Sequence, residues 1–181
     1  MAQPTTDTVY TREYQPALQS FDPQYSLTFA PVMLLGPILQ VNVERKLSRH
    51  VSASLFGGGG GRPGDPSVVF ADAGATVRFY PLTSTFWKGP HIGMQTSWAA
   101  AWVEGWDEVA GERDRGAGHV ITAGPLFGYK YIWRSGFTME FQIVVAIGQM
   151  RGEGDFLGPG EEPHWRRASL ALPFWNVGWS F

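Results

Sequence analysis

Large apolar residues alternate with small or polar residues along most of the chain. The segments ILQVNVERK (residues 38–46) and FTMEFQIVVAIGQM (residues 137–150) both keep this period of two. The last seven residues, WNVGWSF, place four large apolar side chains at alternate positions: Trp175, Val177, Trp179 and Phe181. Successive side chains of a β-strand point to opposite faces, so this pattern predicts strands with one apolar face each. No stretch keeps the helical spacing i, i+3, i+4, i+7 over several turns.

We expect eight strands, at residues 25–35, 37–47, 51–60, 68–80, 90–103, 118–132, 137–150 and 168–181. At about ten or more residues each, they exceed the five or six residues usual in soluble proteins and match the nine to eleven needed to cross a bilayer. The second and sixth strands are followed by the short LSRH and WRSG, whereas long loops follow the third, fifth and seventh. This alternation of short turns and long loops is typical of transmembrane barrels. The tight first loop, LLGP, and the longer PLTSTFWKG fit this pattern less well.

The predicted fold class is therefore all-β, an eight-stranded antiparallel up-and-down transmembrane β-barrel over residues 25–181. Residues 1–24 are polar, contain several prolines, and are interpreted as a flexible N-terminal arm. Whether the arm enters the lumen stays open. The opening residues MAQPTTDTVY lack the basic start and apolar run of a secretory signal peptide, so we expect an export signal to lie outside this sequence.

Composition agrees with a membrane protein that has no transmembrane helix. The 181 residues are 44% apolar and only 17% charged, below the roughly 25% charged residues of soluble domains, and they include eight tryptophans. No run of about 18 apolar residues occurs. The absence of cysteine excludes disulfides and thiolate sites. The net charge of -2, without a basic and aromatic motif, predicts no nucleic-acid partner.

Alternation alone does not decide which face is inside, because a soluble lipocalin-like barrel alternates too, with its apolar face inward. The tryptophans indicate the answer, since they gather where strands are predicted to end: Trp87, Trp102, Trp106, Trp133 and Trp165. Amphipathic rings at both ends of strands are typical of the aromatic belts at membrane interfaces. We therefore expect the apolar faces, with the C-terminal alternation, to face lipid.

Four charged residues on the polar faces are predicted to form one layer inside the barrel. When the strands are aligned by their short-turn ends, the four lie at a similar distance from that end: Glu44, Arg78, Lys130 and Glu140. Two acids and two bases compensate each other, as buried charges require. An eight-stranded barrel is just wide enough for side chains to fill it. The lumen is therefore expected to be polar and closed. Solvated surface charges on a soluble barrel are the alternative.

The two ends of the predicted barrel differ in charge. Acidic residues are frequent in the long loops around residues 104–114 and 153–162, whereas the short side carries Arg45, Lys46, Arg49, Lys88 and Arg134. Solubility is the simpler explanation of the acidic loops. The alternative is that they hold divalent cations that bridge anionic lipid headgroups.

The closing ALPFWNVGWSF resembles the C-terminal insertion signal of bacterial outer-membrane β-barrels. The stretches PVMLLGPILQVNVERKLSRHVSASLFGGGGG and GPLFGYKYIWRSGFTMEF are similar to hairpins of small eight-stranded members, of the OmpA-like kind and of a related family without assigned function. This resemblance implies a monomer in the outer membrane of a Gram-negative bacterium. It also implies that the assembly machinery reads the terminal Phe181. The likeness covers residues 25–181 and carries no motif for an activity.

Catalytic and metal chemistry find little support. The histidines, His50, His91, His119 and His164, show no metal-site spacing, and GGGGGRPG lacks the Lys-Ser/Thr of a phosphate-binding loop. Ser97 lies roughly 20 Å along the strand from His91, too far for a catalytic pair. We expect no enzyme activity and no cofactor, and a structural, adhesive or loop-mediated recognition role. The alternatives are a narrow or gated small-solute channel, or a soluble lipocalin-like carrier.

Overall fold

The computed structural model describes residues 22–35, 38–61, 68–82, 88–107, 112–153 and 166–181, with backbone alone at some positions near the loops. The elements, in chain order, are β1 (Tyr25–Phe29), the 3-10 helix η1 (Pro31–Leu35), β2 (Ile38–Lys46), β3 (Val51–Gly61), β4 (Val68–Phe79), β5 (Gly89–Asp107), β6 (Glu112–Ile132), β7 (Phe137–Glu153) and β8 (Arg166–Ser180). No helix among these residues is long and apolar enough to cross a membrane.

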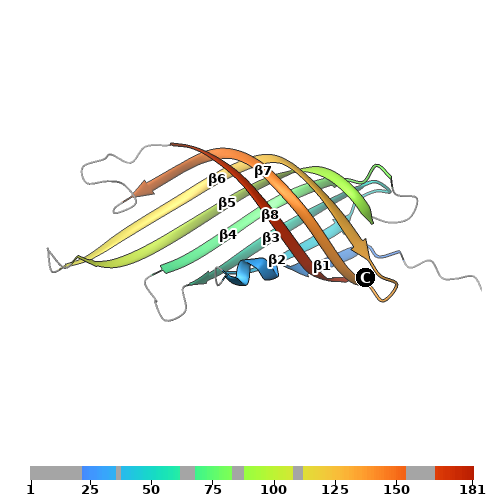
Figure 1. The fold of residues 1–181 in the computed structure, drawn as a ribbon, viewed down its shortest axis with the longest axis horizontal. Helices are drawn as coiled ribbons and strands as arrows, with labels where there is room; N and C mark the ends of the chain where they lie inside the picture. Colours follow the sequence, from blue (N-terminus) through green and yellow to red (C-terminus); the bar gives the residue numbers. More distant parts are fainter. Residues whose placement is uncertain (1–21, 36–37, 62–67, 83–87, 108–111, 154–165) are drawn as a thin grey trace, which may run out of the picture.

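The eight strands form one closed barrel in sequence order, with β8 returning to pair with β1 (Figure 1). Every neighbouring pair is antiparallel, as in the ladder that joins β7 to β8 from Phe137↔Trp179 to Met150↔Arg166. The prediction of an all-β, eight-stranded antiparallel barrel is confirmed. Closure leaves the sheet without a free edge along the paired strands, which removes the usual template for aggregation.

The predicted first strand, residues 25–35, is wrong in its second half. β1 ends at Phe29, and Pro31–Leu35 form η1 instead. Proline lacks the N–H that a ladder needs and fixes its own φ, so Pro31 ends the strand and suits the start of a helical turn. The seam between β1 and β8 is consequently short, from Ser26↔Ser180 to Phe29↔Val177. The fifth, sixth and seventh strands extend further toward the long loops than predicted.

Backbone hydrogen bonds fix the short-turn end of the barrel. In the turn between β6 and β7, the Gly136 N–H donates to Trp133 O at 2.9 Å. Gly136 has φ of 86°, a conformation open to glycine at little cost. The terminal Phe181 pairs with Tyr25 through its own N–H at 2.9 Å, and its carbonyl accepts from Gln24 at 2.8 Å. The last residue of the chain is thus part of the closing seam.

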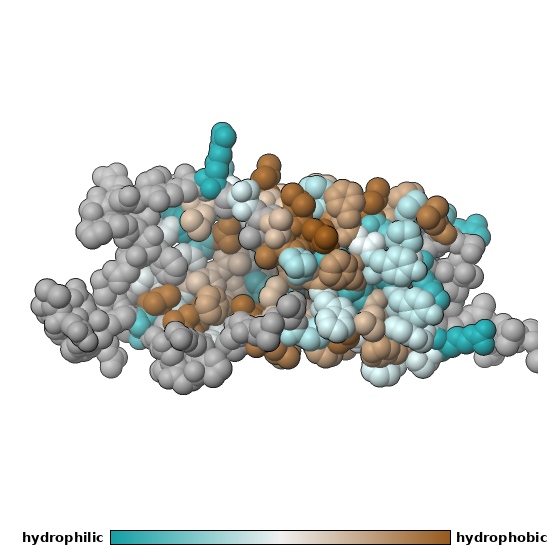
Figure 2. Space-filling model, in the orientation of Figure 1, coloured by the Kyte–Doolittle hydropathy of each residue, from teal (hydrophilic) through white to brown (hydrophobic). Residues whose placement is uncertain are grey.

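The two faces of the barrel wall are opposite in character to those of a soluble protein. Outward side chains are large, apolar and exposed, as at Leu55 (69%) and Ile147 (72%). Inward side chains near the short-turn end are polar or charged and fully buried. Figure 2 shows hydrophobic residues over the middle of one face, with large rings of near-neutral hydropathy toward the end that carries the C terminus. Charged residues are almost never fully buried unless they are paired, so the interior needs its own explanation.

The height of the apolar exterior can be judged along β7. Its outward positions are apolar from Phe137 to Ile147, and the next outward residue is Gln149. At about 3.3 Å per residue and a strand tilt of about 40°, that stretch covers roughly 25 Å along the barrel axis. This equals the height of the apolar band on transmembrane barrels.

Candidate functional site

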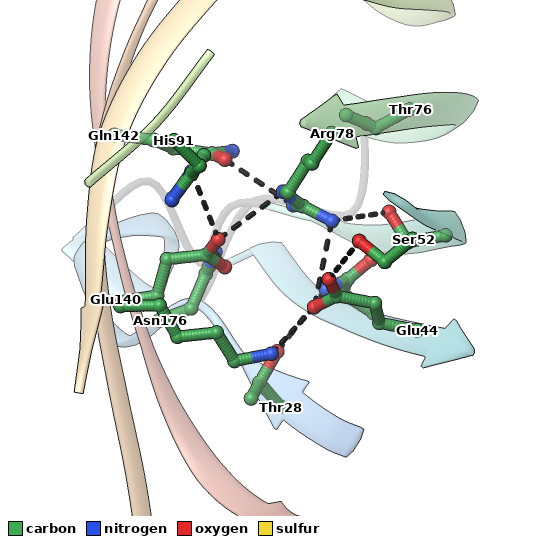
Figure 3. A network of polar contacts seen from close by, with 12 residues as sticks. Thr28, Glu44, Ser52, Thr76, Arg78, His91, Glu140, Gln142 and Asn176 are labelled. Carbon is green, nitrogen blue, oxygen red and sulfur yellow. Dashed lines mark hydrogen bonds and ion pairs between the residues drawn. The ribbon is translucent and has the colours of Figure 1, made fainter. Parts of the chain in front are cut away.

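The structure brings the four predicted charged residues together inside the barrel. Strand alternation turns each of them inward, from β2 (Glu44), β4 (Arg78), β6 (Lys130) and β7 (Glu140). Their side chains are all 0% or 1% exposed to solvent. Figure 3 shows Glu44, Arg78 and Glu140 converging from different strands of the barrel.

Glu44 is the first of the two buried carboxylates, and it accepts hydrogen bonds from several side chains. Lys130 Nζ donates to its Oε2 at 2.5 Å, and Arg78 Nη1 lies 3.6 Å from the same oxygen. The hydroxyl of Tyr80 donates to Oε1 at 3.1 Å, and the hydroxyl of Ser52 donates to that oxygen as well. Both carboxylate oxygens therefore have hydrogen-bond donors, which a buried carboxylate requires.

Glu140 is the second carboxylate. Its Oε1 lies 3.2 Å from Arg78 Nε and 3.3 Å from His91 Nε2, and its Oε2 accepts from Asn176 Nδ2 at 3.1 Å (Figure 3). The Arg78 guanidinium thus lies between the two carboxylates. The planar guanidinium presents its donors in a fixed fork, so one arginine can hold two acids on different strands.

The two terminal nitrogens of Arg78 each donate a hydrogen bond. Nη1 donates to Ser54 Oγ at 2.8 Å, and Nη2 donates to Gln142 Oε1 at 3.2 Å. The formal charges of the two acids and two bases cancel. Moving each ion out of water costs several kcal/mol, which close ion pairs and hydrogen bonds offset. The contacts of Glu140 Oε1 with Arg78 Nε and His91 Nε2 are ion-pair distances without hydrogen-bond geometry. We call these four residues, with Tyr80 and His91, the charged layer.

The sequence pattern did not predict that Tyr80 and His91 belong to the charged layer. The pattern places His91 on an inward face, and Tyr80 lies two residues after Arg78 and so shares its side. Which inward residues meet at one height depends on the register between strands, which alternation does not determine. Tyr80 packs beside His91 with ring centroids 5.1 Å apart.

The described side chains pack closely at this height of the lumen. The cavity on the long-loop side of the layer measures only about 10 Å³, and its lining includes Gln40, Thr76 and Gln95. A cavity of that size has room for about one water molecule.

The structure places two of the predicted interfacial tryptophans, Trp133 and Trp102, with their side chains. Trp133 is partly exposed at the short-turn end. Its ring centroid lies 4.3 Å from that of Tyr131 and 5.1 Å from that of Phe137. Trp102 is exposed on the outward face of β5 near its other end. Only the backbone is described at Trp106. Trp87 and Trp165 lie outside the described residues, as do residues 1–21 of the predicted arm.

The C-terminal alternation lies on the outward face of β8. Trp175, Trp179 and Phe181 are exposed, and Val177 is partly exposed, whereas Asn176 and Ser180 between them are buried. The Phe181 ring stacks on Tyr25 with centroids 6.3 Å apart, and Phe137 contacts Trp179 at 5.2 Å. These rings form one aromatic surface around the short-turn end of the barrel.

The other polar groups do not form a second site of recognisable chemistry. Ser97 pairs with Thr122 at 2.7 Å rather than with a histidine, and within the described ranges no group of three or more His, Asp or Glu is placed to hold a metal ion. His164 and the acidic residues Glu108, Asp155, Glu161 and Glu162 lie outside those ranges. Comparison with known proteins finds no matching family model, no matching curated protein and no matching solved structure.

Proposed function

We propose that this protein is an integral β-barrel of a bacterial outer membrane whose lumen is closed by the charged layer. The observation that carries the proposal is the inverted distribution of side chains, with exposed apolar residues around the outside and fully buried ion pairs within. A closed barrel satisfies its backbone hydrogen bonds internally, which the bilayer interior demands. In water, an apolar surface of this extent promotes aggregation.

The proposed role is structural, adhesive or one of recognition through the long loops. A closed lumen leaves the outer surface and the loops as the parts that meet other molecules. β5 and β6 extend to Asp107 and Glu112, five and more residues beyond the outward Trp102 along the chain, so the strands themselves continue past the apolar band. Loops held on a rigid scaffold are frequent sites of binding.

The proposed partners are the lipids of the outer membrane and the barrel-assembly machinery. Phe181 and the outward rings before it supply an aromatic strand end that such machinery can read. The apolar exterior includes residues of every strand, from Leu27 on β1 to Trp175 on β8, which favours a monomer surrounded by lipid. No cofactor is proposed.

Planar-bilayer recording tests the closed lumen. We expect the wild-type protein to insert without steady single-channel conductance, because the charged layer leaves room for about one water molecule. Insertion is checked in parallel by protease protection of the barrel in the same lipid. Steady conductance in the wild type would contradict the closed lumen.

The gated-channel alternative makes a different prediction in that experiment. Arg78 bridges the two carboxylates, so a gate would depend on its position. A silent wild type together with a conducting Arg78→Ala variant would favour a gate over a permanent plug. A soluble carrier would need its apolar face inward, which is the reverse of the exposure seen at Leu55 and Ile147.

A further inference from the structure

The lumen changes character on the long-loop side of the charged layer. Four buried apolar side chains form a cluster there, Leu126, Val144, Ala146 and Phe174, with Met33 and Leu172 packed against it. The sequence predicted a polar lumen. Here the cluster lies on the β6–β8 side, whereas Gln40, Thr76 and Gln95 keep the facing wall polar. Apolar side chains inside a membrane barrel are not stabilised by contact with water. Their presence therefore indicates that this half of the lumen has a role other than holding the ion pairs.

Further toward the long loops, the inward side chains no longer fill the lumen. The inward positions there are only half-buried, whereas those of the charged layer are buried. Apart from Asp72 on β4, those that form the lining are apolar: Val68, Phe70, Ala99, Ala101, Val103 and Val120. We call the space that they line the outer vestibule. Since these side chains point away from the outside of the wall, their accessible surface lies within the barrel.

The neighbouring strand β3, which pairs with β4, leaves further space. β3 ends in five glycines, Gly57–Gly61, two of which take inward positions, so this strand contributes no side chains there. The carboxylate of Asp72 lies over Gly58, where an added Cβ would come within 2.5 Å of Oδ1, and it accepts a hydrogen bond from Gln40. This pair marks the inner floor of the vestibule. An eight-stranded barrel can hold one small ligand when its side chains leave room.

The wall beside the apolar cluster is not made of paired strands. β1 ends at Phe29, and beyond it η1 lies against β2 and β8. Met33 of η1 packs on the cluster from that side. A hydrocarbon chain at this point of the exterior is separated from the apolar interior by a single helical turn, without a β1–β8 ladder to break.

We propose that the outer vestibule binds one hydrocarbon chain, supplied by a bilayer lipid or by a free single-chain amphiphile. The apolar lining, the unfilled space and the thin wall at η1 together favour an alkyl chain over a polar solute. The proposal rests on the membrane location given above, because the bilayer is the source of such chains.

The absence of cysteine makes a direct test practical. Bimane is attached to Ala101→Cys, which points into the vestibule, and to Ala123→Cys, a matched alanine that is exposed on the outward face of the next strand. Both proteins are folded into phosphatidylcholine vesicles with brominated or ordinary acyl chains. Bromine quenches a fluorophore that it touches, and iodide quenches one that meets water.

We expect brominated lipid to quench the label at both positions and iodide to quench neither. Brominated fatty acid added to vesicles of ordinary lipid distinguishes the two sources of the hydrocarbon chain. If only this acid, and not brominated lipid, quenches the label at position 101, the bound chain comes from a free amphiphile. Adding Ala99→Phe, which fills the vestibule, is expected to remove quenching by bromine at position 101 and leave position 123 unchanged.

Two outcomes would overturn separate claims. In the first, iodide but not brominated lipid quenches the label at position 101, while brominated lipid quenches the label at position 123. This result would show a water-filled vestibule and would refute the ligand proposal alone. Failure of brominated lipid to quench position 123 would refute the membrane location itself. The protein's circular dichroism, measured for each variant, identifies any that does not fold.

Discussion

Glu44→Gln is expected to lower the free energy of unfolding by about 3–5 kcal/mol, the cost of breaking a buried ion pair by removing one partner. Lys130 Nζ lies 2.5 Å from the Glu44 carboxylate, both side chains are 0% exposed, and Arg78 lies beside them. Without the carboxylate charge, a buried ammonium group keeps no full counter-charge. Urea unfolding of the barrel in lipid vesicles, followed by tryptophan fluorescence, measures the change.

A second acid–base pair of nearly the same length serves as the control. Asp22 Oδ1 lies 2.6 Å from Lys46 Nζ, but Asp22 is 45% exposed. Asp22→Asn is expected to change stability by at most about 1 kcal/mol, as is usual for exposed pairs. Combining Glu44→Gln with Lys130→Met should recover part of the loss, because both charges are then gone. Equal effects of Glu44→Gln and Asp22→Asn would mean that the lumen is hydrated.

Ile143→Arg is expected to destabilise the barrel in a bilayer by about 2–4 kcal/mol, the cost of a basic residue on the lipid face near the midplane. Ile143 is 43% exposed on the outward face of β7, midway along its apolar stretch. If this face met water, a substitution at an exposed position would change stability by no more than about 0.5 kcal/mol. Unfolding by urea in vesicles again gives the value.

Gln149→Arg is the matched control on the same strand and face. It lies past Ile147, at the end of the apolar stretch, where an arginine costs about 0–1 kcal/mol. The two substitutions add the same side chain at different depths. A cost for Ile143→Arg no larger than that for Gln149→Arg would contradict the lipid-facing assignment of β7.

The alternation of side chains was sufficient to predict the barrel and the inward direction of the charged residues. Arg78, Lys130 and Glu140 each lie between apolar or aromatic neighbours, and Glu44 continues the polar positions Gln40 and Asn42 of its strand. The side of the strand that each residue takes therefore follows from its place in the sequence. The end of β1 was harder to predict. Pro31 follows an alternating segment and precedes VMLL, an apolar run that suits a strand or a short helix equally well.

The alternation of side chains does not predict the register between strands or how completely side chains fill the lumen. Tyr80 and His91 join the charged layer only because strands distant in sequence meet at one height, which the ladders determine. The outer vestibule was missed for a related reason. Ala99, Ala101 and Val103 are too small to signal a facing direction, and whether they fill a lumen depends on the side chains opposite them.

Folding with and without lipid tests the central claim most directly. The protein is diluted from urea into plain buffer or into buffer with phosphatidylcholine vesicles, and its mobility in SDS is compared before and after boiling. We predict a heat-dependent shift in mobility only for the sample folded with vesicles, because the apolar exterior requires lipid to cover it. A folded, soluble monomer in plain buffer would contradict the membrane-spanning barrel.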